Sequence, residues 1–189
     1  MSVAEWAVTM ISVETLNQAL AAATLVLEIA TIAFLALFFI RKRFPDLNDI
    51  GDMLARNGLW LGCILTLGGM ATSLFYSEIL GFAPCAWCWW QRVFLYAQVP
   101  LFGLALAKRD THIADYSIAL SVSGACVALY QHYLQMGGAS IIPCPANLSR
   151  ASDCAQRFLF EFGYITFPLM CFSLFAFLIV VMLFVRNKR

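Results

Sequence analysis

Five apolar segments, each long enough to cross a bilayer, decide what this chain can fold into. A membrane-spanning helix needs about 20 apolar residues, and such stretches occupy residues 19–40, 59–80, 85–107, 113–133 and 165–185. Only 12% of the residues are charged, about half the fraction of a typical soluble domain. Because a helix satisfies all its backbone polar groups within lipid, we predict an all-α integral membrane protein.

The basic residues predict how the spans are oriented. If the five spans alternate in direction, nine of the twelve Lys and Arg residues fall on one side: Arg41, Lys42, Arg43, Arg56, Lys108, Arg109, Arg186, Lys188 and Arg189. The positive-inside rule assigns that side to the cytoplasm. The N-terminus is then outside and the C-terminus inside. Since its basic cluster follows the first span, that span is predicted to be a retained anchor and not a signal peptide.

Four of the seven cysteines fall on the predicted outer side, where disulfides persist. Four cysteines allow three pairings. The C-x-x-C spacing favours Cys85 with Cys88, which leaves Cys144 with Cys154 in the outer loop, residues 134–164. The other three lie inside spans and are expected to be small apolar core residues: Cys63, Cys126 and Cys171.

Three uses of the outer cysteines compete. A structural staple suits Cys144 and Cys154, whereas a C-x-x-C disulfide closes too short a loop to stabilise the fold much. A zinc site would need both pairs to meet as a closed tetrahedron, and no metal is expected. A c-type haem is disfavoured because Trp89, not His, follows Cys88. Redox chemistry is the favoured interpretation.

The position of the C-x-x-C pair supports redox chemistry. Pro84 starts the third span, so Cys85 and Cys88 lie at a helix N-terminus, which favours the thiolate that attacks in disulfide exchange. A lipid-soluble electron acceptor can reach this depth. Arg92 follows Cys88 by four residues and shares its helix face. It either extends to the headgroups or stabilises negative charge on a thiolate or acceptor.

The ordered motifs resemble one known family. Pro84-Cys85-x-x-Cys88-x-x-x-Arg92 resembles the active-site motif of the DsbB-type disulfide-bond formation proteins. Tyr130-Gln131-His132 is similar to that family's histidine position, and a second cysteine pair follows in the next outer loop. The resemblance covers four of the five spans, from about residue 60. It implies a four-helix transmembrane bundle, to which this chain adds one N-terminal transmembrane helix.

The resemblance also implies a function. It predicts a quinone-dependent thiol oxidase of the bacterial inner membrane that supports disulfide-bond formation. Such an enzyme reoxidises a periplasmic thioredoxin-like protein of the DsbA type and passes the electrons to ubiquinone or menaquinone. Arg92 and His132 are the residues that the resemblance implies near the quinone, with Arg92 binding it and His132 supporting its binding or protonation.

The resemblance assigns a role to each outer cysteine. Cys144 is attacked by the partner's thiolate, and Cys154 passes the electrons to Cys85 through a transient disulfide between the loops. Cys88 then forms the adduct or charge-transfer contact with the quinone. The aromatic stretch at residues 157–164 is predicted to lie on the membrane surface as a short helix, which would bring Cys154 towards Cys85.

Features outside the resemblance leave alternatives open. Residues 1–55 are predicted to hold an outer tail, the extra span and a basic linker, and residues 56–189 the DsbB-like bundle. Glu28, in the middle of the extra span, faces either a neighbouring helix or a partner protein. A vitamin-K-epoxide-reductase-like enzyme is disfavoured because its C-x-x-C follows the loop pair. A non-enzymatic membrane subunit with structural or metal-binding cysteines is the third possibility, and no nucleic acid partner is expected.

Overall fold

A computed structural model describes residues 13–41, 43–44, 47–142, 144 and 153–188. Its helices are α2 (Val13–Ile40), α3 (Asn48–Leu74), the π-helical turn η2 (Phe75–Ile79), α4 (Ala86–Tyr96), α5 (Gln98–Lys108), α6 (Ile113–Gln135) and α7 (Phe167–Asn187). Four helical segments are long and apolar enough to cross a membrane: α2, α3 with η2, α6 and α7. The predicted all-α membrane bundle is confirmed. The predicted outer tail and the basic residues Lys42 and Arg189 lie outside the described residues.

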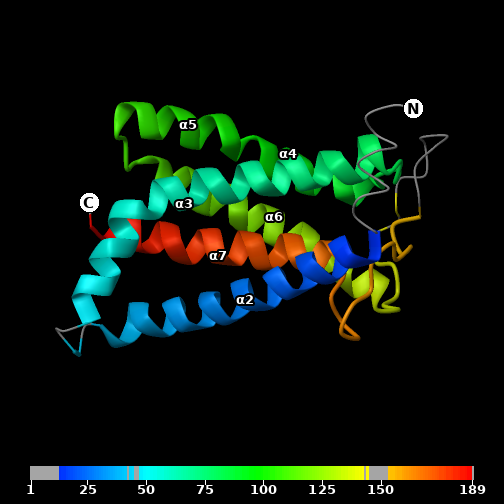
Figure 1. Ribbon diagram of the computed structural model, residues 1–189, viewed down its shortest axis with the longest axis horizontal. Coiled ribbons are helices and arrows are strands. Elements are labelled where there is room, and N and C mark those ends of the chain that lie inside the picture. The colour runs from blue at the N-terminus through cyan, green and yellow to red at the C-terminus, as the bar shows by residue number, and fades with distance from the viewer. Residues whose placement is uncertain (1–12, 42, 45–46, 143, 145–152, 189) are drawn as a thin grey trace.

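The third predicted span consists of two helices. α4 and α5 have 11 residues each and follow one another with Ala97 between them (Figure 1). Pro100 has no N–H to donate to the Tyr96 carbonyl, and its ring crowds that carbonyl. The helix therefore breaks at Ala97, and only the two pieces together have the length of a span.

α7 is the central helix of the bundle and packs against α6, α3 and α2. Its buried side chains include Phe175, Leu178, Val181 and Met182. Gly124 lets α6 approach closely, because a Cβ atom there would lie 2.5 Å from the Phe175 ring. The absent side chain at Gly124 thus sets the distance between these two helices.

Gly124→Ala should destabilise the bundle, since the added methyl group overlaps the Phe175 ring and overpacking costs about 1–3 kcal/mol. Thermal unfolding of the purified protein in detergent should show a lower midpoint. Gly103→Ala in α5 is the matched control, because no atom lies within 4 Å of a Cβ added there. Equal midpoints for the two variants would contradict this account of the α6–α7 contact.

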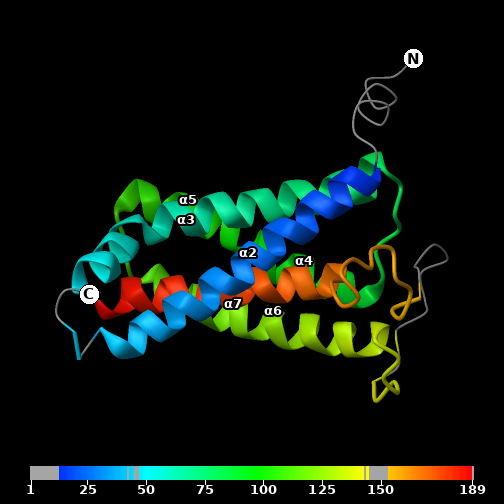
Figure 2. The same ribbon diagram turned by 60° about the horizontal axis from the view of Figure 1, so that its bottom comes forward.

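The extra helix α2 crosses α7 obliquely and reaches the end of α3 (Figure 2). Glu28 joins it to its neighbours: Ser173 Oγ of α7 donates to Oε1 at 2.9 Å, and the Tyr164 hydroxyl donates to Oε2 at 3.2 Å. Desolvation and the nearby Glu28 carboxylate raise the pKa of Tyr164. Sequence analysis predicted that Glu28 faces either a neighbouring helix or a partner protein. In the structure it faces the neighbouring helix α7.

Two ion pairs join helices at the end of the bundle that carries the basic residues. Arg186 Nε lies 3.2 Å from Asp115 Oδ1, and Lys188 Nζ lies 3.4 Å from Asp52 Oδ2. All four side chains are exposed, so each pair contributes at most about 1 kcal/mol. The C-x-x-C pair lies at the opposite end.

Candidate redox site

Cys85 caps the N-terminus of α4. Its backbone is extended, with φ −76° and ψ 173°, and its Sγ accepts a hydrogen bond from the Cys88 N–H at 3.3 Å. The two Sγ atoms are 2.8 Å apart as a pair of thiols, and Cys85 is only 2% exposed. This geometry directs both sulfurs to the helix N-terminus, where the helix dipole favours a thiolate.

Gln131 of α6 contacts both sulfurs. Its Nε2 donates to Sγ of Cys85 at 3.1 Å and to Sγ of Cys88 at 3.2 Å. Its Oε1 accepts a hydrogen bond from Gln91 Nε2 at 2.6 Å. Because Gln91 occupies the carbonyl oxygen, the amide N–H groups of Gln131 face the sulfurs and can stabilise a thiolate. The sequence motif contained Gln131, but an uncharged amide gave no reason to select it over the adjacent histidine.

Arg92 lies deeper in α4 and is buried with partners. Its Nη2 donates to the Ser73 carbonyl at 3.0 Å, and its guanidinium lies 5.1 Å from the Trp89 ring centre. The residue is 9% exposed. These contacts hold the guanidinium within the bundle and not at the headgroups, and its role in stabilising negative charge stays a prediction.

Cys88 and Arg92 line a cavity of about 470 Å³, a volume typical of small-molecule sites. Gln91 and Gln131 add their amides at the same end. The remaining walls are largely apolar and come from four helices, represented by Leu27 in α2, Leu65 in α3, Leu95 in α4 and Leu174 in α7. The cavity therefore suits an elongated molecule with a polar head near the cysteines and an apolar body.

The structure does not bring His132 to this cavity. Its Nδ1 lies 2.9 Å from Thr166 Oγ1, and Thr166 caps α7 by accepting the Leu169 N–H. Consecutive helical residues point about 100° apart, so Gln131 faces the sulfurs while His132 faces α7. The role of His132 in quinone binding stays a prediction.

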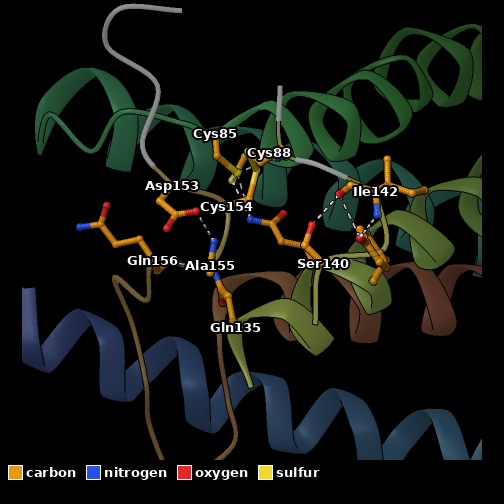
Figure 3. Close-up of a disulfide and its surroundings, with 12 residues drawn as sticks. Cys85, Cys88, Gln135, Ser140, Ile142, Asp153, Cys154, Ala155 and Gln156 are labelled. Carbon is orange, nitrogen blue, oxygen red and sulfur yellow. Dashed lines mark hydrogen bonds between the residues drawn. A yellow bond between two sulfur atoms is a disulfide. The ribbon is translucent and has the colours of Figure 1, made fainter. Parts of the chain in front are cut away.

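Cys144 and Cys154 form a disulfide with Cα atoms 6.0 Å apart, which is the predicted pairing. Cys154 is 1% exposed and packs with Cys85 and Leu134 in one buried cluster. Figure 3 shows Cys154 beside the Cys85–Cys88 pair. Cys144 is less buried and lies at the edge of the cluster. The structure thus brings the two pairs together in one site.

Hydrogen bonds to the end of α6 hold the segment that follows Cys154. Gln135 Nε2 donates to the Gln156 carbonyl at 2.9 Å, and Arg157 Nε donates to the Gln135 carbonyl. Both contacts lie within three residues of Cys154 along the chain. They fix its sulfur close to α4.

The predicted short helix at residues 157–164 is wrong. This segment makes a turn closed by a β-bridge between Glu161 and Ile165. Phe162 and Gly163 have φ values of 51° and 79°, in the left-handed region that interrupts a right-handed helix. The position of Cys154 therefore depends on the contacts to α6 and not on a surface helix.

Comparison with known proteins identifies the family. The family model described as disulfide bond formation protein DsbB matches residues 55–185. The chain belongs to the DsbB family. The resemblance seen in the motifs is confirmed, and α2 lies outside the matched range.

Several curated relatives of this DsbB-family chain carry names of disulfide formation proteins. Probable disulfide formation protein C of Bacillus cereus is 40% identical over 107 residues, which cover 57% of this chain and 73% of the relative. Disulfide bond formation protein C of Bacillus subtilis is 30% identical over 134 residues, 69% of this chain and 94% of the relative. A probable disulfide formation protein C of Halalkalibacterium halodurans is 33% identical over 135 residues, 69% and 95% of the two chains. No solved structure matches the chain.

Family and site together describe a multi-pass membrane protein of disulfide-bond formation. Four of its described helical segments are long and apolar enough to cross a membrane, and its described residues include one disulfide and a C-x-x-C pair of free cysteines. Within the described ranges, no group of three or more His, Cys, Asp or Glu side chains is placed to hold a metal ion.

Proposed function

We propose that this DsbB-family chain reoxidises a thioredoxin-like dithiol protein of the DsbA type and transfers the electrons to a membrane quinone. One observation carries the proposal: the Cys85–Cys88 pair lies between a buried disulfide cysteine, Cys154, and a largely apolar cavity lined by Cys88 and Arg92. A dithiol in this position has an electron donor on one side and room for a lipid-soluble acceptor on the other.

The cavity fits a quinone such as ubiquinone or menaquinone. The Arg92 guanidinium provides hydrogen-bond donors for a carbonyl oxygen, and the apolar walls suit an isoprenoid tail. A bound quinone supplies an acceptor for two electrons and two protons. Arg92 carries the positive charge that favours negative charge developing on that oxygen.

The first exchange takes place at the loop disulfide. Cys144 is the less buried cysteine of that bond, so we expect a partner's thiolate to attack its sulfur. The attack breaks the Cys144–Cys154 bond, joins Cys144 to the partner and releases Cys154 as a thiolate. The partner's second thiol then displaces Cys144. The partner leaves as a disulfide, and both loop cysteines are reduced.

The second exchange moves the two electrons to α4. The Cys154 thiolate attacks Cys85 of the oxidised Cys85–Cys88 pair, and Cys88 leaves as a thiolate that accepts a hydrogen bond from Gln131. Cys144 then attacks Cys154, which restores the loop disulfide and releases Cys85 as a thiol.

We further propose the bacterial inner membrane, with the N-terminus and both cysteine pairs outside and the C-terminus in the cytoplasm. The support is the basic residues at the end of the bundle opposite the cysteines, because positive loops stay in the cytoplasm. A membrane-impermeant thiol reagent should label reduced Cys144 in intact spheroplasts. Labelling that requires lysis would contradict this orientation.

The function is tested with purified protein, a reduced thioredoxin-like partner and a soluble quinone analogue. We expect one quinone to be reduced for each partner disulfide formed, as followed by thiol titration and quinone absorbance. Partner oxidation without quinone consumption would contradict the proposal. A stoichiometric zinc ion bound by the four cysteines would favour the metal-binding subunit instead.

Gln131→Leu should slow quinone reduction by the Cys85–Cys88 dithiol about 10- to 100-fold. The variant loses the hydrogen bonds to both sulfurs, and a hydrogen bond to a charged group is worth about 1.5–3 kcal/mol. Stopped-flow absorbance of the quinone in a single turnover measures the rate. Gln91→Leu removes only the contact that orients the amide, so a smaller loss is expected. A wild-type rate in Gln131→Leu would refute this role.

A further inference from the structure

The extra helix α2 forms one wall of the redox cavity. Leu20, Ala23, Thr24 and Leu27 line it, although the family match begins only at residue 55. α4 contributes Cys88 and Arg92 to the same cavity, and α3 and α7 contribute further lining residues. The site of this chain therefore includes a surface from outside the family's matched range.

Several contacts fix α2 in this position. Ala21 is fully buried against Leu159, Ile165 and Leu169. Further along, Glu28 accepts hydrogen bonds from α7 and from the turn before it. These contacts come from one side of α2 and leave another side for the cavity.

A hydrogen bond near the start of α2 joins the helix directly to the cavity lining. The Tyr76 hydroxyl donates to Asn17 Oδ1, and Tyr76 is itself a lining residue that is 6% exposed. Together with the contacts to α7, this bond connects α2 to both α7 and η2, and Figure 2 shows α2 crossing α7 and ending near the end of α3.

The chemistry of the α2 wall is apolar. Three of its four lining residues are hydrocarbon, and the Thr24 hydroxyl donates to the Leu20 carbonyl at 2.8 Å. The hydrogen-bond donors for a polar head lie on Arg92, in the part of the lining that α4 contributes. An amphipathic ligand that places its head near Cys88 therefore places apolar groups against α2.

The cavity also reaches the lipid-facing surface beside α2. Ala23 of α2 and Ile64 of α3 both line the cavity and are both exposed, Ile64 at 62%. Gly68 of α3 also lines the cavity and is exposed, and no side chain lies within 4 Å of a Cβ added there. A chain longer than the cavity can leave through this side into the bilayer.

We propose that α2 binds the isoprenoid tail of the quinone and that Leu20, Ala23 and Leu27 determine which tails the site accepts. This inference rests on the proposed function, because it names the part of the acceptor that meets α2. The polar head is held by Arg92 of α4, so the two ends of the ligand are bound by different helices.

Photoaffinity labelling tests this contact without measuring turnover. The full chain in lipid vesicles is irradiated with a quinone analogue that carries a diazirine on its tail, and the labelled peptides are identified by mass spectrometry. We expect label within residues 20–27 of α2 as well as on α3. Label confined to α3 and α7 would overturn the inference. Because the experiment uses the wild-type chain, its outcome does not depend on whether a variant folds.

A matched pair of variants tests tail selection. Ala23→Phe places a ring in the cavity, whereas Val26→Phe places the same ring on a position that is 67% exposed and does not line the cavity. We expect Ala23→Phe to weaken binding of a long-tailed quinone about 10-fold and to leave a tail-less quinone unchanged. Tryptophan fluorescence quenching gives both dissociation constants. Val26→Phe should bind both as wild type does.

The outcomes separate the two proposals. If the wild-type chain binds no quinone, the proposed function fails and the inference fails with it. If the wild type binds quinone and Arg92→Met weakens the binding, but Ala23→Phe and Val26→Phe behave alike, only the inference about α2 is overturned. Equal weakening of tailed and tail-less quinones by Ala23→Phe would also overturn it.

Discussion

Cys88→Ser should abolish steady-state oxidation of the partner, with a loss of more than about 10³-fold, as expected when a covalent catalytic group is removed. The variant cannot form the Cys85–Cys88 disulfide, so Cys154 has no bond to attack on α4. The loop disulfide is still present. Each protein should therefore oxidise one partner molecule and then stop.

Thiol titration of the partner measures this single turnover. One partner disulfide per protein is expected in Cys88→Ser, and many in the wild type, with quinone absorbance unchanged in the variant. Cys126→Ser is the matched control. The expectation that Cys126 is a core residue is wrong, because it is a free, exposed cysteine of α6 that does not line the redox cavity. Repeated turnover by Cys88→Ser would show that the electrons leave by another route.

Arg92→Met should lower quinone reduction by about 10²–10³-fold, the effect of removing a preorganised donor from a site where negative charge develops. The guanidinium is buried at the cavity beside Cys88, and methionine keeps most of its apolar volume without its charge. The first exchange, at Cys144 and Cys154, should proceed at the wild-type rate, because it does not involve the cavity.

Two assays separate the effect of the substitution on quinone reduction from its effect on the first exchange. Quinone titration at saturating partner gives kcat and KM, and a rapid-mixing thiol assay gives the first turnover. Arg92→Lys should be intermediate, since lysine keeps the charge but lacks the planar fork that reaches both Ser73 and the cavity. Arg56→Met, at an exposed position of α3, is the control. Unchanged kcat and KM in Arg92→Met would refute this role for Arg92.

Local sequence features predicted the spans well and their interruptions less well. Four of the five predicted apolar segments correspond to single helical segments of the structure: α2, α3 with η2, α6 and α7. The third became two helices because Pro100 leaves the Tyr96 carbonyl without its helical donor, a signal present in the sequence but outweighed by hydropathy. The aromatic segment before α7 was predicted as a helix, and its left-handed residues, Phe162 and Gly163, make it a turn.

At the site, residue chemistry and spacing indicated reactive groups but not their neighbours. The C-x-x-C spacing selected Cys85 and Cys88, and elimination paired Cys144 with Cys154, as in the structure. On α6, the resemblance of the motifs selected His132, the residue after Gln131. The rotation of α6 within the bundle instead directs Gln131 to the sulfurs, and packing between helices sets that rotation.

The sequence by itself determined which segments enter the membrane and which cysteines lie at one end of the bundle. Both follow from local properties, the hydropathy and charge of neighbouring residues. Only the tertiary structure decided that Gln131 reaches Cys85, 46 positions away, that Arg92 binds the Ser73 carbonyl, and that α2 lines the cavity. These contacts depend on how side chains from distant helices fit together, because packing fixes each helix's rotation and crossing angle.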